Sequence, residues 1–264
     1  MVDVVIYGAG AAGLVIGSRL HKGGANVTLV ARGESYQKIK DEGVVLVNKS
    51  GEEENLRLNV TDQPESIKNP DYILIATKAY AIPEIAPSIA KMIGDKTTVV
   101  PLCNGVPWWL FQKYDGEFSG KSFACLEPND EISSHIKTDN VMGAVIYMGA
   151  SKTSPNTALN IAGPHFIVGE LDGKDTKRLN NIVKLMEDSG FKKPKSENIR
   201  TAIWQKLTWN MAFNPLSVIT KKHSIGLVED PETHKKAEQL MFEMQKVADA
   251  INLDVKIDVA ERME

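Results

Sequence analysis

The stretch VDVVIYGAGAAGLVIGSRL, residues 2–20, constrains the fold more than any other part of the chain. Residues 2–7 form a short β-branched run, as expected of a buried parallel strand. Gly8, Gly10 and Gly13 follow with the spacing G-x-G-x-x-G. Residues 14–20 predict a helix that stops at Gly23-Gly24, and residues 26–31 predict a second strand. A glycine loop between a strand and a helix, with a second strand close behind, is typical of a dinucleotide-binding fold.

Each glycine of this loop has its own expected role. The first permits a tight turn out of the strand, the second lets the backbone approach a pyrophosphate, and the third lets the helix pack closely on the sheet. The helix N-terminus then offers free N–H groups and a positive dipole end to phosphates. The alternative is a bare structural turn, but the strand–helix–strand context favours dinucleotide binding.

The end of the second strand indicates which dinucleotide is bound. An NAD site usually places Asp or Glu there, to bond the ribose 2′-hydroxyl. Here the sequence LVARGES places Arg32 at that position, and a guanidinium suits a 2′-phosphate through paired hydrogen bonds. This favours NADP. Two alternatives remain: Glu34 can be interpreted as the NAD acid, and Arg32 as a solvated surface charge.

The strand pattern continues through the first half of the chain. Residues 44–48 and 56–60 predict a hairpin, residues 72–76 a strand that ends near Lys78, and residues 97–102 a strand followed by Asn104-Gly105. Ligands of a doubly wound sheet bind at the carboxyl ends of its strands. Lys78 is therefore expected to reach cofactor phosphate or ribose, unless it is a plain surface lysine. Asn104 is expected to contact nicotinamide or substrate, and Asn-Gly is also a common tight turn.

The following residues suggest packing and then antiparallel strands. Trp108 and Trp109 are expected to pack rather than take part in chemistry. Beyond residue 120 the alternation of strands and helices stops. Four segments look like consecutive strands that extend the sheet in antiparallel fashion: residues 121–128, 140–150, 157–163 and 165–171.

The second half of the chain is predicted to be helical. Residues 175–189 and 197–219 have helical spacing, and an acid–proline start at Asp230-Pro231 begins an amphipathic helix to about residue 250. We therefore expect an α/β architecture of two domains. Residues 1–170 form the NADP-binding Rossmann domain, and residues 171–264 form a helical domain for substrate binding and dimerisation.

A polar stripe crosses the apolar stretch 202–220, AIWQKLTWNMAFNPLSVIT. Lys206, Asn210 and Asn214 recur every four residues and so share one helix face. The other faces are apolar, which predicts a helix buried on most sides. A buried ammonium and two buried amides are costly without partners, which suggests a ligand; a polar face that meets water is the plainer alternative. Pro215 suggests that Asn214 lies at a kink or at a helix end.

Composition excludes several classes of protein. The net charge of −3 implies no general attraction to nucleic acid or acidic membranes. Two cysteines are too few for a disulfide scaffold and fit a reducing compartment. No apolar run reaches the roughly 18 residues of a membrane helix, so a cytoplasmic protein is expected. The five histidines show no metal-ligand spacing, so no metal site is expected.

Taken together, these elements resemble the ketopantoate reductase family (2-dehydropantoate 2-reductases). The resemblance covers nearly the whole chain. It rests on Arg32 and four motifs: GAGAAG at 8–13, TKAY at 77–80, CNGVPWW at 103–109 and WQKLTWNMAFNPLSVIT at 204–220. The glycine motif alone is shared by many dehydrogenases, whereas Asn-Gly-Val together with K-x3-N-x3-N is much more specific.

The resemblance implies a fold and an activity. The fold is an N-terminal NADPH-binding Rossmann domain and an all-helical C-terminal domain of the 6-phosphogluconate dehydrogenase C-terminal type, with the active site in the cleft between them. The activity is NADPH-dependent reduction of the C2 ketone of 2-dehydropantoate to pantoate, on the route to pantothenate and coenzyme A. A lysine ammonium suits this reaction because hydride addition builds negative charge on the ketone oxygen.

The resemblance also assigns roles to individual residues. Lys206 would be the general acid, Asn210 and Asn214 would hold substrate groups, and Asn104 would position substrate and nicotinamide. Catalysis would thus depend on Lys206, Asn210 and Asn104. Cofactor binding would fall to Gly8, Ala9, Gly10, Ala11, Ala12, Gly13, Arg32, Lys78 and Asn104.

One departure from the family pattern leaves alternatives open. The family continues into a segment with Ser-Ser-Met or Thr-Ser-Met and a later Glu, which bind substrate, whereas this sequence ends at VAERME. We therefore expect a helical domain that is incomplete at its C-terminus, with an uncovered apolar face on its last helix through which a homodimer could form. The alternatives are a reductase of another 2-oxo acid or opine-like substrate, and an NADPH-binding protein without turnover.

Overall fold

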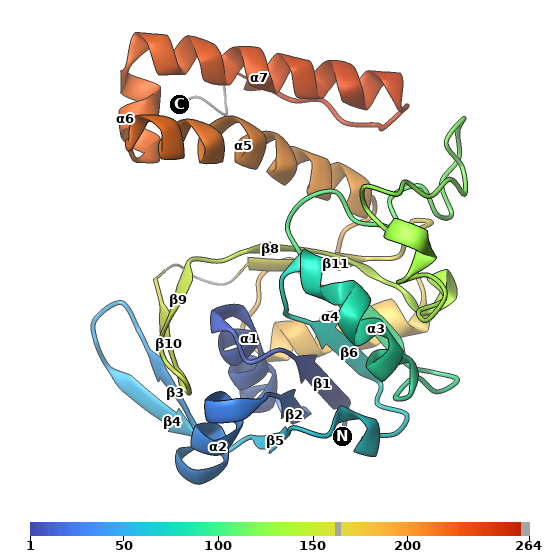
Figure 1. Ribbon diagram of the computed structural model, residues 1–264, viewed down its shortest axis with the longest axis vertical. Helices are drawn as coiled ribbons and strands as arrows, with labels where there is room; N and C mark the ends of the chain where they lie inside the picture. Colours follow the sequence, from blue (N-terminus) through green and yellow to red (C-terminus); the bar gives the residue numbers. More distant parts are fainter. Residues whose placement is uncertain (162–164, 260–264) are drawn as a thin grey trace. The chain divides into compact units, whose positions relative to one another are not determined.

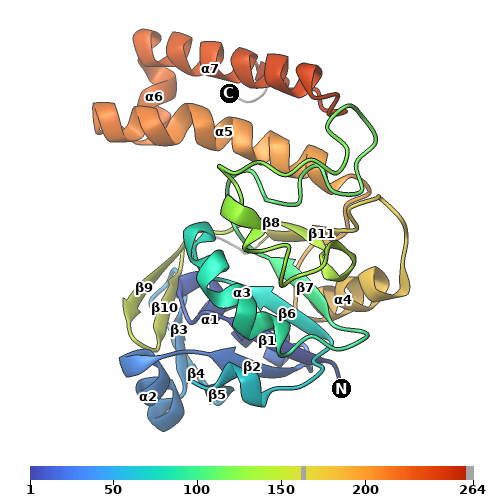
Figure 2. The same ribbon diagram turned by 45° about the vertical axis from the view of Figure 1, so that its right-hand side comes forward.

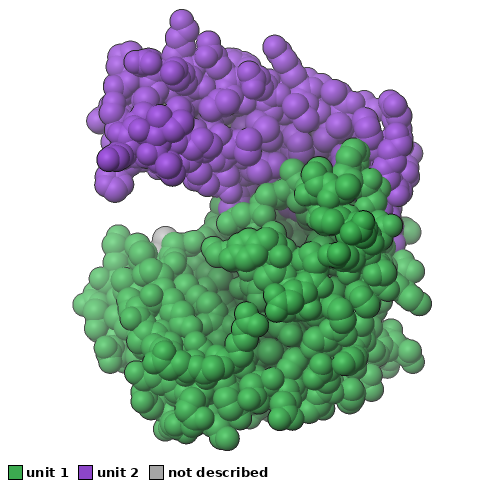
Figure 3. All heavy atoms as spheres, in the orientation of Figure 1, with its two compact units in different colours: residues 1–109, 122–199 green, residues 110–121, 200–264 purple. Residues whose placement is uncertain are grey.

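The computed structural model describes residues 1–161 and 165–259 of the chain (Figure 1). The chain divides into two compact units, coloured separately in Figure 3. Unit 1 comprises residues 1–109 and 122–199, and unit 2 comprises residues 110–121 and 200–264.

Unit 1 is built on a five-stranded parallel sheet of order β5-β2-β1-β6-β7. All neighbouring strands of this sheet run parallel. The apolar runs predicted as strands lie in its buried centre, and β6 and β7 are buried along their whole length. Its strands are β1 (Asp3–Tyr7), β2 (Asn26–Val30), β5 (Asn59–Thr61), β6 (Tyr72–Ile75) and β7 (Thr98–Pro101). The α/β interpretation of the first half is confirmed.

Four helices connect or flank these strands (Figures 1 and 2). Helix α1 follows β1, α2 follows β2, and α3 lies between β6 and β7 in the sequence, as βαβ connections require. The helices are α1 (Ala11–Lys22), α2 (Gly33–Glu42), α3 (Ile82–Ala90) and α4 (Lys177–Asp188), with short 3-10 turns η1 (Pro64–Ser66), η2 (Ala79–Ala81), η3 (Pro128–Asp130) and η4 (Thr138–Asn140).

The remaining strands of unit 1 do not extend the parallel sheet, and this prediction was wrong. Two of them join the predicted hairpin in a second sheet of order β4-β3-β10-β9, and two form a separate antiparallel pair. The strands of the second sheet are β3 (Val44–Val47), β4 (Glu53–Leu56), β9 (Ala150–Ser154) and β10 (Thr157–Asn160); the pair is β8 (Gly143–Tyr147) with β11 (His165–Gly169). The pairing of β10 with β3 joins distant parts of the sequence, so no local pattern could indicate it.

Two local predictions also need correction, and a third lies partly outside the described residues. Residues 121–128 form turns, because Leu126 and Glu127 donate their backbone N–H groups to the Phe123 carbonyl and leave no extended strand. The second hairpin strand is Glu53–Leu56 rather than 56–60, and residues 59–61 form the edge strand β5. Of the segment 157–163, residues 162 and 163 lie outside the described residues.

The helices of unit 2 within the described residues are α5 (Ile199–Thr220), α6 (Ser224–Glu229) and α7 (Pro231–Ala250). Helices α5 and α7 lie side by side and are joined through α6 (Figures 1 and 2). The acid–proline start of α7 is confirmed: the Asp230 carboxylate accepts hydrogen bonds from the backbone N–H groups of Glu232 and Thr233. The core of this unit contains Ala212, Phe213, Leu216, Leu227, Ala237, Met241 and Val259.

One expectation for α5 was wrong, and one of two alternatives for Asn214 is excluded. The helix continues through Pro215 to Thr220, so Asn214 lies within the helix and not at its end. Nor is α5 buried on most sides, since the large apolar side chains Met211, Val218 and Ile219 are exposed. The helical unit therefore carries apolar surface in addition to its core.

Segment 110–121 belongs to unit 2 because buried groups attach it to α5. The buried Arg200 guanidinium donates from Nε to the Leu110 carbonyl at 2.7 Å and from Nη2 to the Gln112 carbonyl. The Tyr114 hydroxyl donates to the Ile251 carbonyl just after α7. The Arg200 guanidinium thus donates hydrogen bonds to carbonyl groups of segment 110–121 that would otherwise lack partners.

We expect Arg200→Met to lower the free energy of unfolding by about 1–3 kcal/mol, because it leaves buried carbonyl groups without donors. Arg57→Met is the matched control, since the exposed Arg57 donates to a single carbonyl at the surface; its effect should stay within about 0.5 kcal/mol. Urea unfolding followed by tryptophan fluorescence measures both. Equal effects of the two substitutions would contradict this role of Arg200.

Candidate functional site

The glycine loop lies between β1 and α1, and two of its glycines are required by geometry. Gly8 has φ +114°, a backbone conformation that L side chains rarely adopt. A Cβ on Gly13 would lie 2.0 Å from the Gly8 carbonyl oxygen, so any side chain there collides with the loop backbone. The third glycine therefore allows close packing of helix on loop, in agreement with its expected role.

Gly10 differs from its two neighbours. Its φ of −78° suits any residue, and a Cβ would have its nearest neighbour, the Ala76 carbonyl oxygen, at 4.0 Å. Gly10 is also the N-cap of α1, where no side chain caps the helix and no acidic residue lies in the first turn. Open space beside uncapped N–H groups is what a pyrophosphate needs.

A cavity of about 250 Å³ opens beside this loop, at the carboxyl ends of β1, β2 and β6. Its wall includes Gly8 and Ala9 from the loop, Arg32 and Ser35 from the end of β2 and the start of α2, and Thr77 after β6. The lining thus combines the glycine loop with the segment that follows β2, which are the two parts expected to contact a dinucleotide.

Charges of both signs line this cavity. The Arg32 side chain is 90% exposed, and its Nη1 lies 3.6 Å from the Glu84 Oε1 atom. Asp62 and Glu84 also line the wall. The guanidinium is therefore accessible to a phosphate, and part of its charge is already offset by a carboxylate.

The ends of β6 and β7 bring two further candidates to the same edge of the sheet. The Cys103 thiol donates to the Thr77 carbonyl at 3.6 Å, which joins the segments that carry Lys78 and Asn104. Burial raises the pKa of Cys103 to about 11, although the nearby Lys78 ammonium lowers it. Lys78 and Asn104 are both exposed. Gly105 has φ +96°, and the chain bends at residues 104 and 105.

The two tryptophans that follow are packing residues, as predicted. Trp108 and Trp109 are both buried. A Cβ on Gly143 of β8 would lie 2.7 Å from the Trp109 ring. This close approach of the indole to a glycine excludes the ring from an open site.

One residue near the glycine loop was missed by the sequence analysis. The Lys152 ammonium on β9 donates to the Ala9 carbonyl at 2.9 Å and to the Ser35 hydroxyl at 2.8 Å. Partial burial lowers the pKa of Lys152, and Glu34 raises it. The partners are 143 and 117 residues away in the sequence, and the lysine belongs to no motif, so no local signal could have found it.

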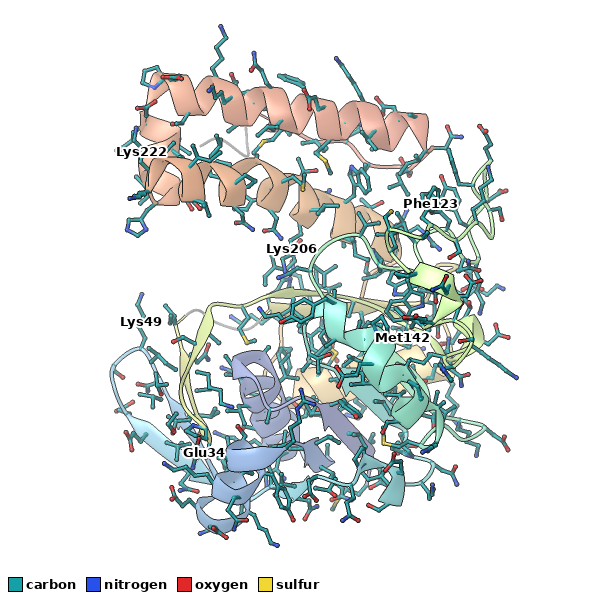
Figure 4. All side chains as sticks on the ribbon, viewed as in Figure 1. Glu34, Lys49, Phe123, Met142, Lys206 and Lys222 are labelled. Carbon is teal, nitrogen blue, oxygen red and sulfur yellow. The ribbon has the colours of Figure 1, made fainter. Side chains whose placement is uncertain are left out.

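Helix α5 of unit 2 carries the polar stripe expected from the sequence. Lys206 and Asn210 are half-buried, whereas Asn214 is exposed. Burial lowers the pKa of Lys206 to about 8. The Lys206 side chain is labelled in Figure 4. A lysine with this pKa holds a proton at neutral pH and can release it close to working pH.

Among residues 1–161 and 165–259, no group of three or more His, Cys, Asp and Glu side chains is placed to hold a metal ion. In the same part of the chain, none of the helices has the length and apolar character needed to cross a membrane.

The parallel sheet, its glycine loop and the cavity beside that loop define a Rossmann-type dinucleotide-binding protein. Two family models match the chain: Ketopantoate reductase PanE/ApbA over residues 4–173, and Ketopantoate reductase PanE/ApbA C terminal over residues 198–264. The chain therefore belongs to the ketopantoate reductase family, dinucleotide-dependent oxidoreductases that act on small keto acids.

Curated relatives and solved structures agree with this assignment. The 2-dehydropantoate 2-reductase of Mesorhizobium japonicum is 30% identical over 262 residues, which cover 99% of this chain and 80% of that protein. A candidate ketopantoate reductase structure from Ralstonia solanacearum has a TM-score of 0.93 at 30% identity and covers 100% of this chain and 81% of that one. A D-mandelate dehydrogenase in a ternary structure with NADH and anilino(oxo)acetate has a TM-score of 0.81 at 25% identity, covering 98% and 77%.

Alanine substitutions at Gly13 and Gly10 should affect different properties, the first mainly stability and the second mainly dinucleotide binding. We expect Gly13→Ala to lower the free energy of unfolding by about 1–3 kcal/mol, because its Cβ overlaps the loop backbone. Gly10→Ala should cost less than about 1 kcal/mol, the scale of an N-cap change. It should weaken dinucleotide binding at least about tenfold by filling the space beside the loop. Thermal unfolding and fluorescence titration measure the pair; a Gly10→Ala protein that binds normally would contradict this assignment.

Proposed function

We propose that this chain reduces the C2 ketone of 2-dehydropantoate to pantoate with NADPH, a step toward pantothenate and coenzyme A. The observation that carries the proposal is Lys206, whose pKa is lowered to about 8 on the same helix face as Asn210 and Asn214. Membership of the ketopantoate reductase family supports the reaction class.

The cofactor-binding residues in this proposal are those of unit 1. The backbone of residues 8–13 holds the pyrophosphate, the Arg32 guanidinium contacts the ribose 2′-phosphate, and Lys78 and Asn104 approach the cofactor from the ends of β6 and β7. The open space at Gly10 and the cavity of about 250 Å³ support this fit. The bound cofactor supplies a hydride to the C2 carbon of the substrate.

The remaining chemistry belongs to unit 2. As negative charge builds on the ketone oxygen, the Lys206 ammonium stabilises it and donates a proton, which leaves a neutral amine and a hydroxyl group. The amine then regains a proton from solvent. Asn210 and Asn214 orient the substrate through hydrogen bonds to its carbonyl and hydroxyl groups, and Asn104 positions substrate against nicotinamide. The apolar surface of the helical unit supports a homodimer formed through that unit.

Reduction should depend on the protonated form of Lys206. Because only the ammonium donates a proton, kcat/KM for reduction should be level below pH 8 and fall as the pH rises through the pKa of Lys206. Lys206→Arg should move this fall to higher pH, and Lys206→Ala should lower kcat about 10²- to 10⁴-fold. Lys246→Ala, on the exposed side of α7, is the control. A Lys206→Ala protein that retains full activity would remove the lysine from the mechanism.

The cofactor preference should depend on Arg32. We expect the wild type to favour NADPH over NADH, and Arg32→Ala to reduce this ratio about tenfold or more by removing a charged hydrogen bond. Arg57→Ala, which changes an exposed arginine outside the cavity lining, is the control. The ratio of kcat/KM values for the two dinucleotides is the measurement. A wild type that prefers NADH would show the NADPH proposal to be wrong.

A second candidate function is NADH-dependent reduction of another 2-oxo acid. The carboxylates Asp62 and Glu84 beside Arg32 favour it, as does the similarity to the D-mandelate dehydrogenase structure with NADH. Ketopantoate and phenylglyoxylate, each assayed with both dinucleotides, separate the two candidates. Cofactor binding without turnover on any oxo acid would instead indicate a non-catalytic NADPH-binding protein.

A further inference from the structure

Lys152 connects the second sheet to the nucleotide-binding end of the parallel sheet. It lies on β9, which packs with β10 against α1 (Figures 1 and 2). Its ammonium donates to the Ala9 carbonyl in the glycine loop and to the Ser35 hydroxyl in the first turn of α2. A single cation therefore bridges the two segments that a dinucleotide contacts.

Among the described residues, no carboxylate forms an ion pair with the Lys152 ammonium. An ammonium has three N–H donors, and two of them are directed to a neutral carbonyl and a neutral hydroxyl. Within the described residues Lys152 has no third hydrogen-bond partner and forms no ion pair; Glu34 is the acid that acts on it electrostatically. A brace between two loops needs no positive charge, and Lys152 is exposed, so its ammonium is accessible to a ligand. The arrangement suits an anionic ligand.

The position of Ser35 indicates which anion this is. Both partners of the ammonium, Ala9 and Ser35, line the cavity of about 250 Å³. Ala9 offers a carbonyl oxygen, which cannot bind a phosphate, so it anchors the lysine. Ser35 follows β2 closely, in the region where the ribose 2′ position is recognised. Its hydroxyl accepts from Lys152 and still has a hydrogen to donate.

The other charges around the cavity show why a second cation matters. The positive charge of Arg32 is offset in part by the Glu84 carboxylate, and Asp62 lines the same wall of the cavity. One arginine against two carboxylates is a poor environment for a dianionic phosphate. Lys152 reaches this region from a different sheet: it is not itself part of the cavity lining, but its ammonium donates to Ser35, which is.

Resting on the proposed use of NADPH, we propose that Lys152, together with the Ser35 hydroxyl, binds the 2′-phosphate of the cofactor and is a specificity-determining residue for NADPH over NADH. Arg32 then accounts for only part of the preference. The lysine acts in binding and takes no part in hydride or proton transfer.

The test compares Lys152→Met, which keeps the length of the side chain and removes its charge, with Lys49→Met. Lys49 lies at the exposed tip of the β3–β4 hairpin, well apart from Glu34 at the start of α2 (Figure 4). Calorimetry gives Kd for NADPH, NADH, 2′,5′-ADP and 5′-AMP. We expect Lys152→Met to raise Kd for NADPH and 2′,5′-ADP about 10- to 100-fold, the scale of one charged hydrogen bond. Kd for NADH and 5′-AMP should change less than about threefold. Lys49→Met should leave all of these Kd values unchanged.

Several outcomes would overturn the inference. Equal weakening of NADPH and NADH would make Lys152 a brace of the glycine loop, and unchanged binding of both would leave it no role in the site. If Lys152→Met does not fold, Lys152→Arg and Ser35→Ala replace it. The arginine variant should keep the preference for 2′,5′-ADP over 5′-AMP, and the serine variant should reduce it; the inference fails if Ser35→Ala leaves that preference intact.

The adenosine fragments also separate this inference from the proposed function. They require neither nicotinamide nor substrate. A Lys152-dependent preference for 2′,5′-ADP in a protein that does not reduce ketopantoate would sustain the inference and reject the substrate. Turnover of ketopantoate without a Lys152-dependent preference would support the proposed substrate and reject this inference.

Discussion

The nucleotide-binding end of this protein depends on the close contact between α1 and the glycine loop. Gly13 approaches the Gly8 carbonyl so closely that no Cβ fits between them, and Gly8 itself has a positive φ. These two constraints fix where α1 begins relative to β1. The uncapped N-terminus of the helix therefore points at the space beside Gly10, and the cavity next to it follows from that placement.

Charge at this end of the sheet is balanced rather than simply positive. Arg32 is accessible but lies near Glu84, and Asp62 shares the wall. Lys152 reaches the same corner from β9. All of these charges act on a ligand bound there, and not the arginine at the end of β2 alone. The same balance keeps both NADPH and NADH chemically reasonable ligands for the fold.

Helix α5 combines a structural and a chemical role. Its apolar residues build the core of unit 2 with α6 and α7, and the stacked rings of Trp209 and Phe213 extend that core. Lys206 lies on the same helix, and its partial burial lowers its pKa to about 8. One helix thus carries both core residues and a lysine with a lowered pKa.

The sequence by itself determined the parts that depend on local pattern. The glycine spacing, the β-branched runs and the fourfold spacing on α5 identified the parallel sheet, the nucleotide loop, the family and the stripe of Lys206, Asn210 and Asn214. The glycine loop lies within one strand–loop–helix unit and the polar stripe within one helix, where periodicity and steric limits act directly, and the sheet and the family follow from several such local patterns together.

Only the tertiary structure decided the pairing of distant segments. It placed β9 and β10 on β3 instead of on the parallel sheet, attached residues 110–121 to α5 through Arg200, and brought Lys152 to Ala9 and Ser35. It also placed the Glu84 carboxylate close to the Arg32 guanidinium. These contacts join residues far apart in the chain. Those of the buried Arg200 form because buried polar groups must find partners once the core is packed, whereas Arg32 and Glu84 meet at the surface. No local pattern carries that information.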